Sequence, residues 1–262
     1  MEAETLIHAG GNRILRARLL PPGEGDSALI YIEDMGRVQA QAQQLKLAAL
    51  GRLTANMAHE IRNPLSSISH AAELLVDERS KTAQAKLIRI IGDNTQRLNR
   101  LVGEVLELGR RDRVQTEPLR LAAYLPQFVD ELAINDPDIR SRVQTEIDGE
   151  AVTQFDRTHF HRVLWNLVTN ASRHCSGGLG SIRLTVRRTS TGNVEIDIVD
   201  DGPGIGESLR GQVFEPFFTT HGTGTGLGLY IARELCEANG AQLDLVDEGP
   251  GAHFRIVARG AS

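Results

Sequence analysis

The pattern of apolar and polar positions predicts a long helical segment in the first half of the chain. Between Lys81 and Leu108 apolar side chains recur at alternating steps of four and three residues. Such a 3.5-residue repeat is typical of helices packed in coiled-coil-like bundles. It favours a bundle between chains, and one long helix on a monomer's own core is the alternative. The repeat positions are Leu87, Ile91, Asn94, Leu98, Leu101, Val105 and Leu108.

A second apolar seam precedes the first and predicts an antiparallel helical hairpin. Its spacing is regular up to Ile61 and then breaks between Ile61 and Leu65, which bracket Pro64. Proline removes a backbone donor and clashes with the carbonyl group four residues earlier, so we expect a kink close to His59. The seam consists of Leu47, Leu50, Thr54, Met57, Ile61, Leu65, Ile68, Ala72 and Leu75.

The regions on either side of the hairpin have mixed patterns. Two short strand-like runs, 14–20 and 28–32, come before it, and a polar hinge at 110–113 follows it. Beyond the hinge, period-two and period-3.6 segments alternate, which predicts helices packed on one face of a mixed sheet. The expected elements are strands at 142–147, 152–155, 181–187 and 194–199, helices at 158–174 and 225–237, and a hairpin at 241–257.

Composition narrows the function classes. The formal net charge of −5 gives no electrostatic reason to bind nucleic acid. Two distant cysteines argue against a disulfide framework and a thiolate zinc site. No run of 18 apolar residues and no signal-peptide pattern is present, so we expect a cytoplasmic protein without a membrane segment in this chain. Its first residues resemble the end of a larger domain, and a fuller version could be membrane-anchored.

His59 is the most informative single residue. It lies two positions from both Met57 and Ile61, so it should face away from the seam, and Asn63 shares its face. A neutral imidazole is a competent nucleophile near pH 7, and the carboxylate of Glu60 could act as its base. A solvated histidine beside a solvated glutamate is the alternative. A His-Glu-x-x-His zinc site is excluded because position 63 is asparagine.

Two asparagines suggest a metal-phosphate site in the second half. Asn166 and Asn170 stand four apart on the predicted helix, and Arg173 follows on the same side. A neutral amide oxygen can bind Mg²⁺ without adding negative charge beside phosphates. A pair of solvated helix asparagines is the alternative.

Two glycine-containing segments complete a candidate nucleotide pocket. Asp200 ends a predicted strand just before Gly202 and Gly204, where a buried carboxylate could accept the adenine amino protons. The second segment precedes an apolar helix, so its backbone amides could approach a polyphosphate closely. It comprises Gly224, Thr225, Gly226, Leu227 and Gly228. The lysine of a Walker A motif is absent, so a P-loop is excluded.

Taken in order, these segments resemble the boxes of bacterial two-component sensor histidine kinases. The H box is 59–64, the N box 166–171, the G1 box 200–204, the F box 214–218 and the G2 box 224–228. The resemblance covers residues 37–258. Within the family, residues 39–75 look most similar to sensors that regulate type IV pili.

The resemblance implies an α+β fold with three parts. Residues 1–35 would be the end of a PAS-like sensor domain, and residues 36–112 a dimerisation and phosphotransfer hairpin that forms a four-helix bundle in a homodimer. Residues 113–262 would be a Bergerat-type α/β sandwich that binds ATP.

By the same resemblance, His59 would be phosphorylated, Glu60 would be its base, and Asn63 would orient water for dephosphorylation of a response-regulator receiver domain. Asn170 would hold Mg²⁺, with Asn166 and Arg173 near the phosphates. Asp200 would bind adenine. Residues 207–223 would be a lid in which Phe214 and Phe218 form a latch, and His221 stands where lysine is common in the family.

Two other classes stay open from the residues alone. An ATPase of the chaperone and mismatch-repair type would use Asn170 and Asp200 but would leave His59 unexplained. A non-enzymatic dimerisation module, or a phosphatase-only scaffold, would bind receiver domains without using ATP.

Overall fold

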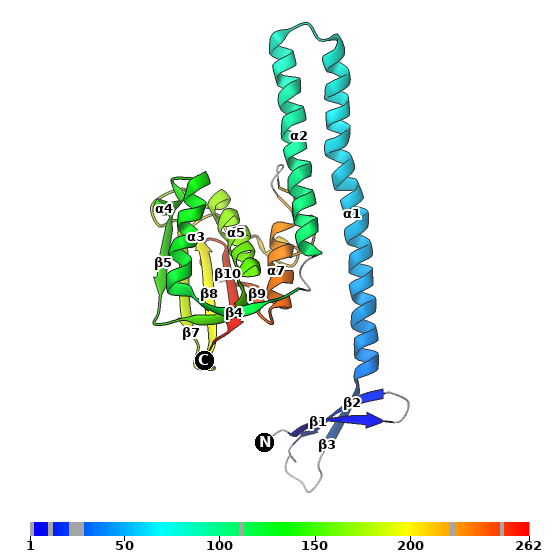
Figure 1. Cartoon of the computed structure of the whole chain (residues 1–262), viewed down its shortest axis with the longest axis vertical. Helices are drawn as coiled ribbons and strands as arrows, with labels where there is room; N and C mark the ends of the chain where they lie inside the picture. The colour runs from blue at the N-terminus through cyan, green and yellow to red at the C-terminus, as the bar shows by residue number, and fades with distance from the viewer. Residues whose placement is uncertain are drawn as a thin grey trace. The chain divides into compact units, whose positions relative to one another are not determined.

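The computed structural model describes residues 3–9, 13–20, 29–109, 113–220, 224–246 and 249–261 (Figure 1). The chain forms two compact units, residues 1–60 and residues 61–262.

The first unit begins with a three-stranded antiparallel sheet. Its strands, in spatial order, are β1 (Ala3–Ala9), β2 (Arg13–Leu20) and β3 (Leu29–Asp34). Strands β2 and β3 agree with the two predicted runs, whereas β1 was not predicted. Helix α1 (Met35–Asp77) follows β3 directly and is continuous through Pro64. The kink expected at Pro64 stays a prediction.

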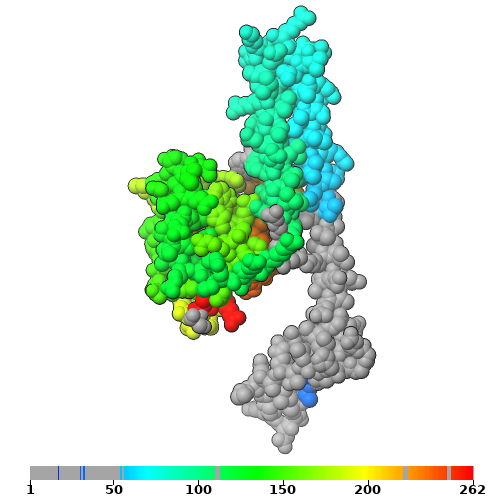
Figure 2. Space-filling view, in the orientation of Figure 1, coloured from blue at the N-terminus to red at the C-terminus, as the bar shows by residue number. Residues whose placement is uncertain are grey.

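The second unit contains the end of α1 and helix α2 (Lys81–Leu108), which lie side by side as a hairpin (Figures 1 and 2). Ser80 caps α2, since its hydroxyl accepts a hydrogen bond from the amide of Ala83. Leu101 is buried, and the other members of the predicted α2 repeat are half-buried. The seven repeat positions therefore form the inward side of α2.

The α1 seam differs from its prediction beyond Met57. Pro64 and Ala71 are the buried residues of this stretch, whereas Leu65 and Ala72, which the seam includes, are exposed. Five apolar side chains on α2 and the end of α1 are more than half exposed: Leu65, Leu74, Val76, Ile88 and Leu106. The hairpin thus has apolar surface on two sides, and the described residues of the second unit cover only one of them.

The rest of the second unit is built on a five-stranded sheet with the order β5-β7-β8-β10-β9. Strand β5 is parallel to β7, and the other pairings are antiparallel. The bounds are β5 Val143–Ile147, β7 Ile182–Arg188, β8 Asn193–Asp200, β9 Gln242–Val246 and β10 His253–Arg259. Strands β5, β7 and β8 lie within one residue of the predicted strands, and β9 and β10 correspond to the predicted hairpin at 241–257.

Helices α3 (Leu121–Asn135), α5 (Arg157–His174) and α7 (Gly228–Ala238) lie on one side of this sheet (Figure 1). The core between the two layers is fully apolar at its centre, where Phe160, Leu164 and Ile196 have no exposed surface. The predicted arrangement of helices on one face of a mixed sheet is confirmed. Smaller elements complete the domain: β4 (Thr116–Arg120) paired with β6 (Val152–Asp156), and the short helices α4 (Ile139–Arg142) and α6 (Glu207–Arg210).

The start of α5 is fixed by Asp156. Its Oδ1 accepts hydrogen bonds from the amides of Thr158 at 2.9 Å and His159 at 3.0 Å, and its Oδ2 accepts one from the amide of Gln115 at 2.8 Å. Burial opposes the charge of this carboxylate, but the hydrogen bonds outweigh it and lower its pKa. The helix that carries both asparagines of the candidate site is therefore anchored to the segment leading in from α2.

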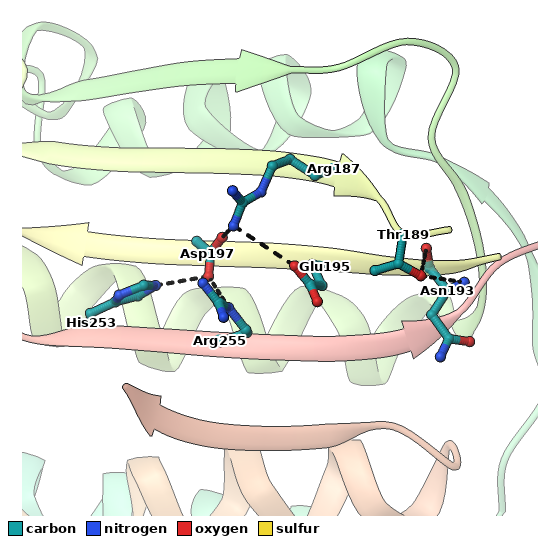
Figure 3. Close-up of polar contacts among 7 residues, drawn as sticks. All are labelled: Arg187, Thr189, Asn193, Glu195, Asp197, His253 and Arg255. Carbon is teal, nitrogen blue, oxygen red and sulfur yellow. Dashed lines mark hydrogen bonds and ion pairs between the residues drawn. The ribbon is translucent and has the colours of Figure 1, made fainter. Parts of the chain in front are cut away.

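The other face of the sheet carries a polar cluster centred on Asp197 (Figure 3). Its Oδ1 accepts hydrogen bonds from Nε of Arg255 at 2.6 Å and is 2.8 Å from Nε2 of His253, while its Oδ2 accepts one from Arg187 at 2.8 Å. Burial opposes the charge on Asp197, yet the hydrogen bonds from Arg255 and His253 hold its pKa below the usual range. The cluster joins the three central strands on the side away from the helices.

Candidate nucleotide site

One wall of a cavity is formed by a single face of α5. Arg162, Asn166 and Asn170 lie at intervals of four residues, so their side chains point in the same direction. All three line a cavity of about 530 Å³, together with Arg173 from the end of the helix. This volume is typical of a small-molecule site.

Nine of the twelve residues predicted to bind ATP line this one cavity. They are Asn166, Asn170, Arg173, Asp200, Gly204, Gly224, Thr225, Gly226 and Gly228. The other three do not line it. Gly202 packs against the backbone of His174, Leu227 is buried, and Phe214 packs on Phe254.

Asp200 is a buried carboxylate at the end of β8. Its Oδ1 accepts hydrogen bonds from the amides of Gly202 at 2.9 Å and Ala252 at 3.2 Å. Burial raises the pKa of this carboxyl above its usual range, because the two amides only partly offset the loss of water. A buried acceptor at the cavity wall is suited to an uncharged donor such as an exocyclic amino group.

Its neighbour Asp201 has a different role. It is exposed, and its two oxygens accept hydrogen bonds from the amide and the hydroxyl of Ser176 at 2.7 and 2.6 Å. These bonds lower the pKa of Asp201. Of these two adjacent carboxylates, Asp200 therefore faces the cavity and Asp201 holds the loop after α5.

The glycine-rich turn is held by a backbone contact with the F box. The amide of Phe217 donates to the carbonyl oxygen of Gly226 at 3.0 Å. Gly226 has a φ of +72°, and a Cβ there would lie 2.4 Å from the backbone of Phe217. Phe217 itself has a φ of +68° and is the one non-glycine residue with positive φ in the part of the chain that the structure describes. Such strain in a bulky residue is typical of functional segments.

The two aromatic residues expected to form a latch have different surroundings. Phe218 lines the cavity. Phe214 stacks edge-on against Phe254, with ring centroids 6.0 Å apart, and the guanidinium group of Arg233 lies 4.9 Å from its ring centroid. Phe214 therefore anchors the base of the expected lid to β10 and α7. His221 lies outside the described residues.

Two groups of cavity residues were not predicted from the sequence. One is on α5, where Arg162 and the chain's only tryptophan, Trp165, line the wall. The other is on α2, where Arg100, Gly103 and Glu104 line the cavity. Helical spacing from Asn166 could have identified Arg162, because it lies one turn earlier on the same face.

The cavity has polar groups suited to the phosphates of a nucleotide. Among the described residues, the buried Nδ2 atom of Asn166 has no hydrogen-bond partner, although it lies in the wall. A buried unpaired donor is costly unless a ligand completes it. Gly228, at the start of α7, lies beside the same amide, since a Cβ there would be 3.5 Å from Oδ1 of Asn166. These features fit phosphate oxygens at the start of α7.

His59 lies on α1 in the first unit, and its ring is exposed, as the helical spacing predicts. Glu60 is half-buried, and Asn63, in the second unit, is exposed. No group of three or more His, Cys, Asp or Glu side chains suited to a metal ion occurs among the described residues. None of the described helices is both long and apolar enough to cross a membrane.

Two family profiles match the chain. The "His Kinase A (phospho-acceptor) domain" matches residues 49–113, and the "Histidine kinase-, DNA gyrase B-, and HSP90-like ATPase" matches residues 155–260. The first match contains His59, and the second contains the α5, β8 and glycine-turn walls of the cavity. The chain belongs to the two-component sensor histidine kinases.

The chain is similar to curated histidine kinases over most of its length. It is 42% identical to the sensor protein kinase PilS of Pseudomonas aeruginosa, over 87% of this chain and 44% of PilS. It is 30% identical to the signal transduction histidine-protein kinase AtoS of Escherichia coli, over 90% of this chain and 40% of AtoS. The chain thus spans less than half the length of these relatives.

Among solved structures, histidine kinase ThkA in complex with response regulator protein TrrA matches 99% of this chain and 79% of its own, with a TM-score of 0.69 and 24% identity. At this identity the likeness shows the fold. The expected α+β fold, a helical hairpin followed by an ATPase domain, is confirmed.

Proposed function

We propose that this histidine kinase transfers the γ-phosphoryl group of ATP to His59 and then to an aspartate of a response-regulator receiver domain. The observation that carries the proposal is the convergence of Asn166, Asn170, Asp200 and the glycine-rich turn on one cavity. An exposed imidazole in the matched phospho-acceptor domain supplies the acceptor.

The cavity residues suggest how ATP would bind. Asp200 would accept a hydrogen bond from the adenine amino group. Asn166 and Arg173 would contact phosphate oxygens, and the amides of the turn at 224–228 would face the same group. Asn170 would hold Mg²⁺ through its amide oxygen. Bound there, the ion would neutralise phosphate charge and orient the triphosphate.

The transfer step needs little covalent help from the protein. A ring nitrogen of His59 would form a bond to the γ-phosphorus as the bond to the β–γ bridging oxygen breaks, and ADP would leave. Glu60 would accept the proton from the other ring nitrogen as positive charge develops on the imidazole. When the protein acts as a phosphatase, Asn63 would orient the water that hydrolyses the phosphorylated aspartate of the receiver domain. Positioning and charge neutralisation would supply most of the rate.

We further propose that the protein acts as a homodimer whose hairpins form a four-helix bundle, at the cytoplasmic side of a longer protein. The apolar side chains left exposed on the hairpin support this arrangement. The solved structure of ThkA is a complex with the response regulator protein TrrA, which supports a receiver domain as partner.

The test is incubation of the purified protein with ATP labelled on the γ-phosphate. We expect acid-labile, alkali-stable label on the wild type and none on His59→Gln, with Asn63→Ala as a matched variant on the same helix face that still gains label. Steady phosphate release that is unchanged in His59→Gln would instead indicate an ATPase. ATP binding that is absent, with receiver binding retained, would indicate a scaffold.

A further inference from the structure

The C-terminal turns of α2 border the nucleotide cavity. Arg100, Gly103 and Glu104 lie in its wall, and Glu107 forms an ion pair with Arg162 of α5. Oε2 of Glu107 is 2.5 Å from Nε of Arg162. The side chains of both residues are about two-thirds covered, at 30% and 34% exposure. The pair is thus better shielded from solvent than an ordinary surface ion pair, which contributes little to the free energy of folding.

Arg162 belongs to the nucleotide-binding face of α5. It precedes Asn166 by one turn and Asn170 by two turns, and all three line the cavity. No lysine lines this cavity in the part of the chain that is described, and the arginines that do so are Arg100, Arg162 and Arg173. A triphosphate is strongly anionic, and the guanidinium group is well matched to phosphate oxygens. Arg162 therefore has the position and the chemistry of a phosphate-binding residue.

A second carboxylate of α2 approaches the other side of the cavity. Glu104 makes a side-chain hydrogen bond with Thr225 in the glycine-rich turn. Burial raises the pKa of Glu104, and its hydrogen bond to Thr225 and the charge of Arg162 only partly offset this effect. Two acidic side chains from one helix thus contact two groups that the nucleotide itself would use.

We propose that Arg162 binds the triphosphate of ATP and that Glu107 of α2 competes with the nucleotide for this guanidinium group. A carboxylate and a phosphate present similar oxygen acceptors, so one arginine cannot satisfy both fully. ATP binding would then weaken the contact between α2 and α5, and the contact would weaken ATP binding to the same extent. The inference rests on the proposed binding of ATP in this cavity.

The test is calorimetric titration of the full chain with Mg·ATP and, separately, with adenosine. We expect Arg162→Gln to weaken ATP binding by about tenfold. Adenosine binding should change by less than about twofold, because adenosine has no phosphate to lose the contact. Arg162→Lys should recover part of the ATP affinity, because it keeps the charge.

The competing role of Glu107 is tested with Glu107→Gln and with the double variant that carries both Arg162→Gln and Glu107→Gln. Glu107→Gln alone should tighten ATP binding roughly two- to fivefold and leave adenosine unchanged. In the Arg162→Gln background, the same change should have no effect on ATP, since the group under competition is gone. Matched controls are Arg140→Gln and Asp130→Asn, which break an exposed ion pair of 2.9 Å outside the cavity and should leave both affinities unchanged.

Several outcomes would overturn the inference. If the Arg162→Gln variant is folded and binds ATP as tightly as the wild type, Arg162 does not bind phosphate. Weaker ATP binding in Glu107→Gln would mean that Glu107 positions Arg162 instead of competing for it. Thermal melting of each variant shows whether it is folded. If Arg162→Gln is not folded, Arg162→Lys is used to test the phosphate-binding role. If the wild type binds adenosine but not ATP, or neither, the proposed function fails first and is distinguished from failure of this inference.

Discussion

The amide of Phe217 donates a hydrogen bond of 3.0 Å to the carbonyl oxygen of Gly226, and the two backbones are so close that no side chain fits on Gly226. Gly226→Ala should therefore displace the F box or the glycine-rich turn, both of which border the cavity. We expect ATP binding to weaken by about tenfold or more, because several amides lose their alignment together. Calorimetric titration with Mg·ATP measures the effect.

Gly240→Ala is the matched control for that change. Gly240 has a φ of +68°, close to the value at Gly226, but a Cβ there would meet nothing within 4 Å. The substitution should cost about 1 kcal/mol of stability through backbone strain. ATP affinity should stay at the wild-type value. Equal losses of ATP affinity in the two variants would show that strain, and not the close approach to Phe217, is responsible.

Asp200→Asn should separate stability from binding. Because burial raises the pKa of Asp200 in the folded state, the folded state holds a proton more tightly than the unfolded chain. The free energy of unfolding therefore falls as pH rises from the ordinary carboxyl pKa through the raised one. At pH 7 the ionised carboxylate of Asp200 destabilises the folded state. We expect Asp200→Asn to melt at a higher temperature at pH 7, while ATP binding falls by about tenfold or more.

Asp201→Asn is the control, because Asp201 is exposed and holds Ser176 instead of facing the cavity. It should keep ATP affinity within about threefold of the wild type. A larger loss than in Asp200→Asn would contradict the assignment of the two carboxylates.

Asp197→Asn should destabilise the domain without a change in ATP affinity. The substitution removes the buried anion that Arg255 and Arg187 share, while Arg187 keeps Glu195 at 3.7 Å, and it should cost about 3 kcal/mol at pH 7. Because the pKa of Asp197 is lowered on folding, its stabilisation is fully present above the ordinary carboxyl pKa of about 3.9 and is lost as pH falls through the lower folded value. The difference between variant and wild type should shrink over that acidic range.

Urea unfolding at several pH values measures this effect, and Glu146→Gln is the control. Glu146 is exposed on β5 and accepts one hydrogen bond from Gln144, so its loss should change stability by less than about 0.5 kcal/mol. An Asp197→Asn penalty that is constant down to the lowest pH would rule out the ionised carboxylate as its source.

Leu106→Glu should convert the proposed homodimer to a monomer. Leu106 and Val102 lie four residues apart on α2 and are 61% and 49% exposed, so they form part of the uncovered apolar side of the hairpin. A charge there would be buried in the dimer without a partner, which is costly. Sedimentation velocity gives the mass. Leu179→Glu, at an 88% exposed position in the loop after α5, should leave the mass unchanged.

The sequence predicted the elements whose pattern is local. Helix α5 is predicted at 158–174 and observed at Arg157–His174, since Asp156 provides a side-chain cap at its start. Helix α7 starts later than predicted, at Gly228, because the residues before it are held against Phe217 by a long-range contact. Helix α3 was not predicted, and Pro126 within it obscures its helical pattern.

The candidate site was predictable to a similar extent. Asn166, Asn170 and Asp200 meet in one cavity because each lies at a defined place on a helix or strand end. The wall from α2 and the ion pair of Glu107 with Arg162 depend on tertiary packing, which no local pattern encodes. The place of Phe214 depends in the same way on Phe254, far along the chain.

Strand β8 carries Asp197 and Asp200 on opposite faces of the sheet, because their positions differ by three, an odd number, and side chains alternate between the faces along a strand. One residue inserted or deleted between them would place both on the same face. Either Asp197 would then lose its arginine partners, or Asp200 would no longer face the cavity to accept a hydrogen bond from adenine. The turn at 189–192 lies outside this strand, so its length does not decide which face either aspartate occupies. Natural length differences among related kinases should therefore accumulate in that turn, whereas β8 should keep a constant length.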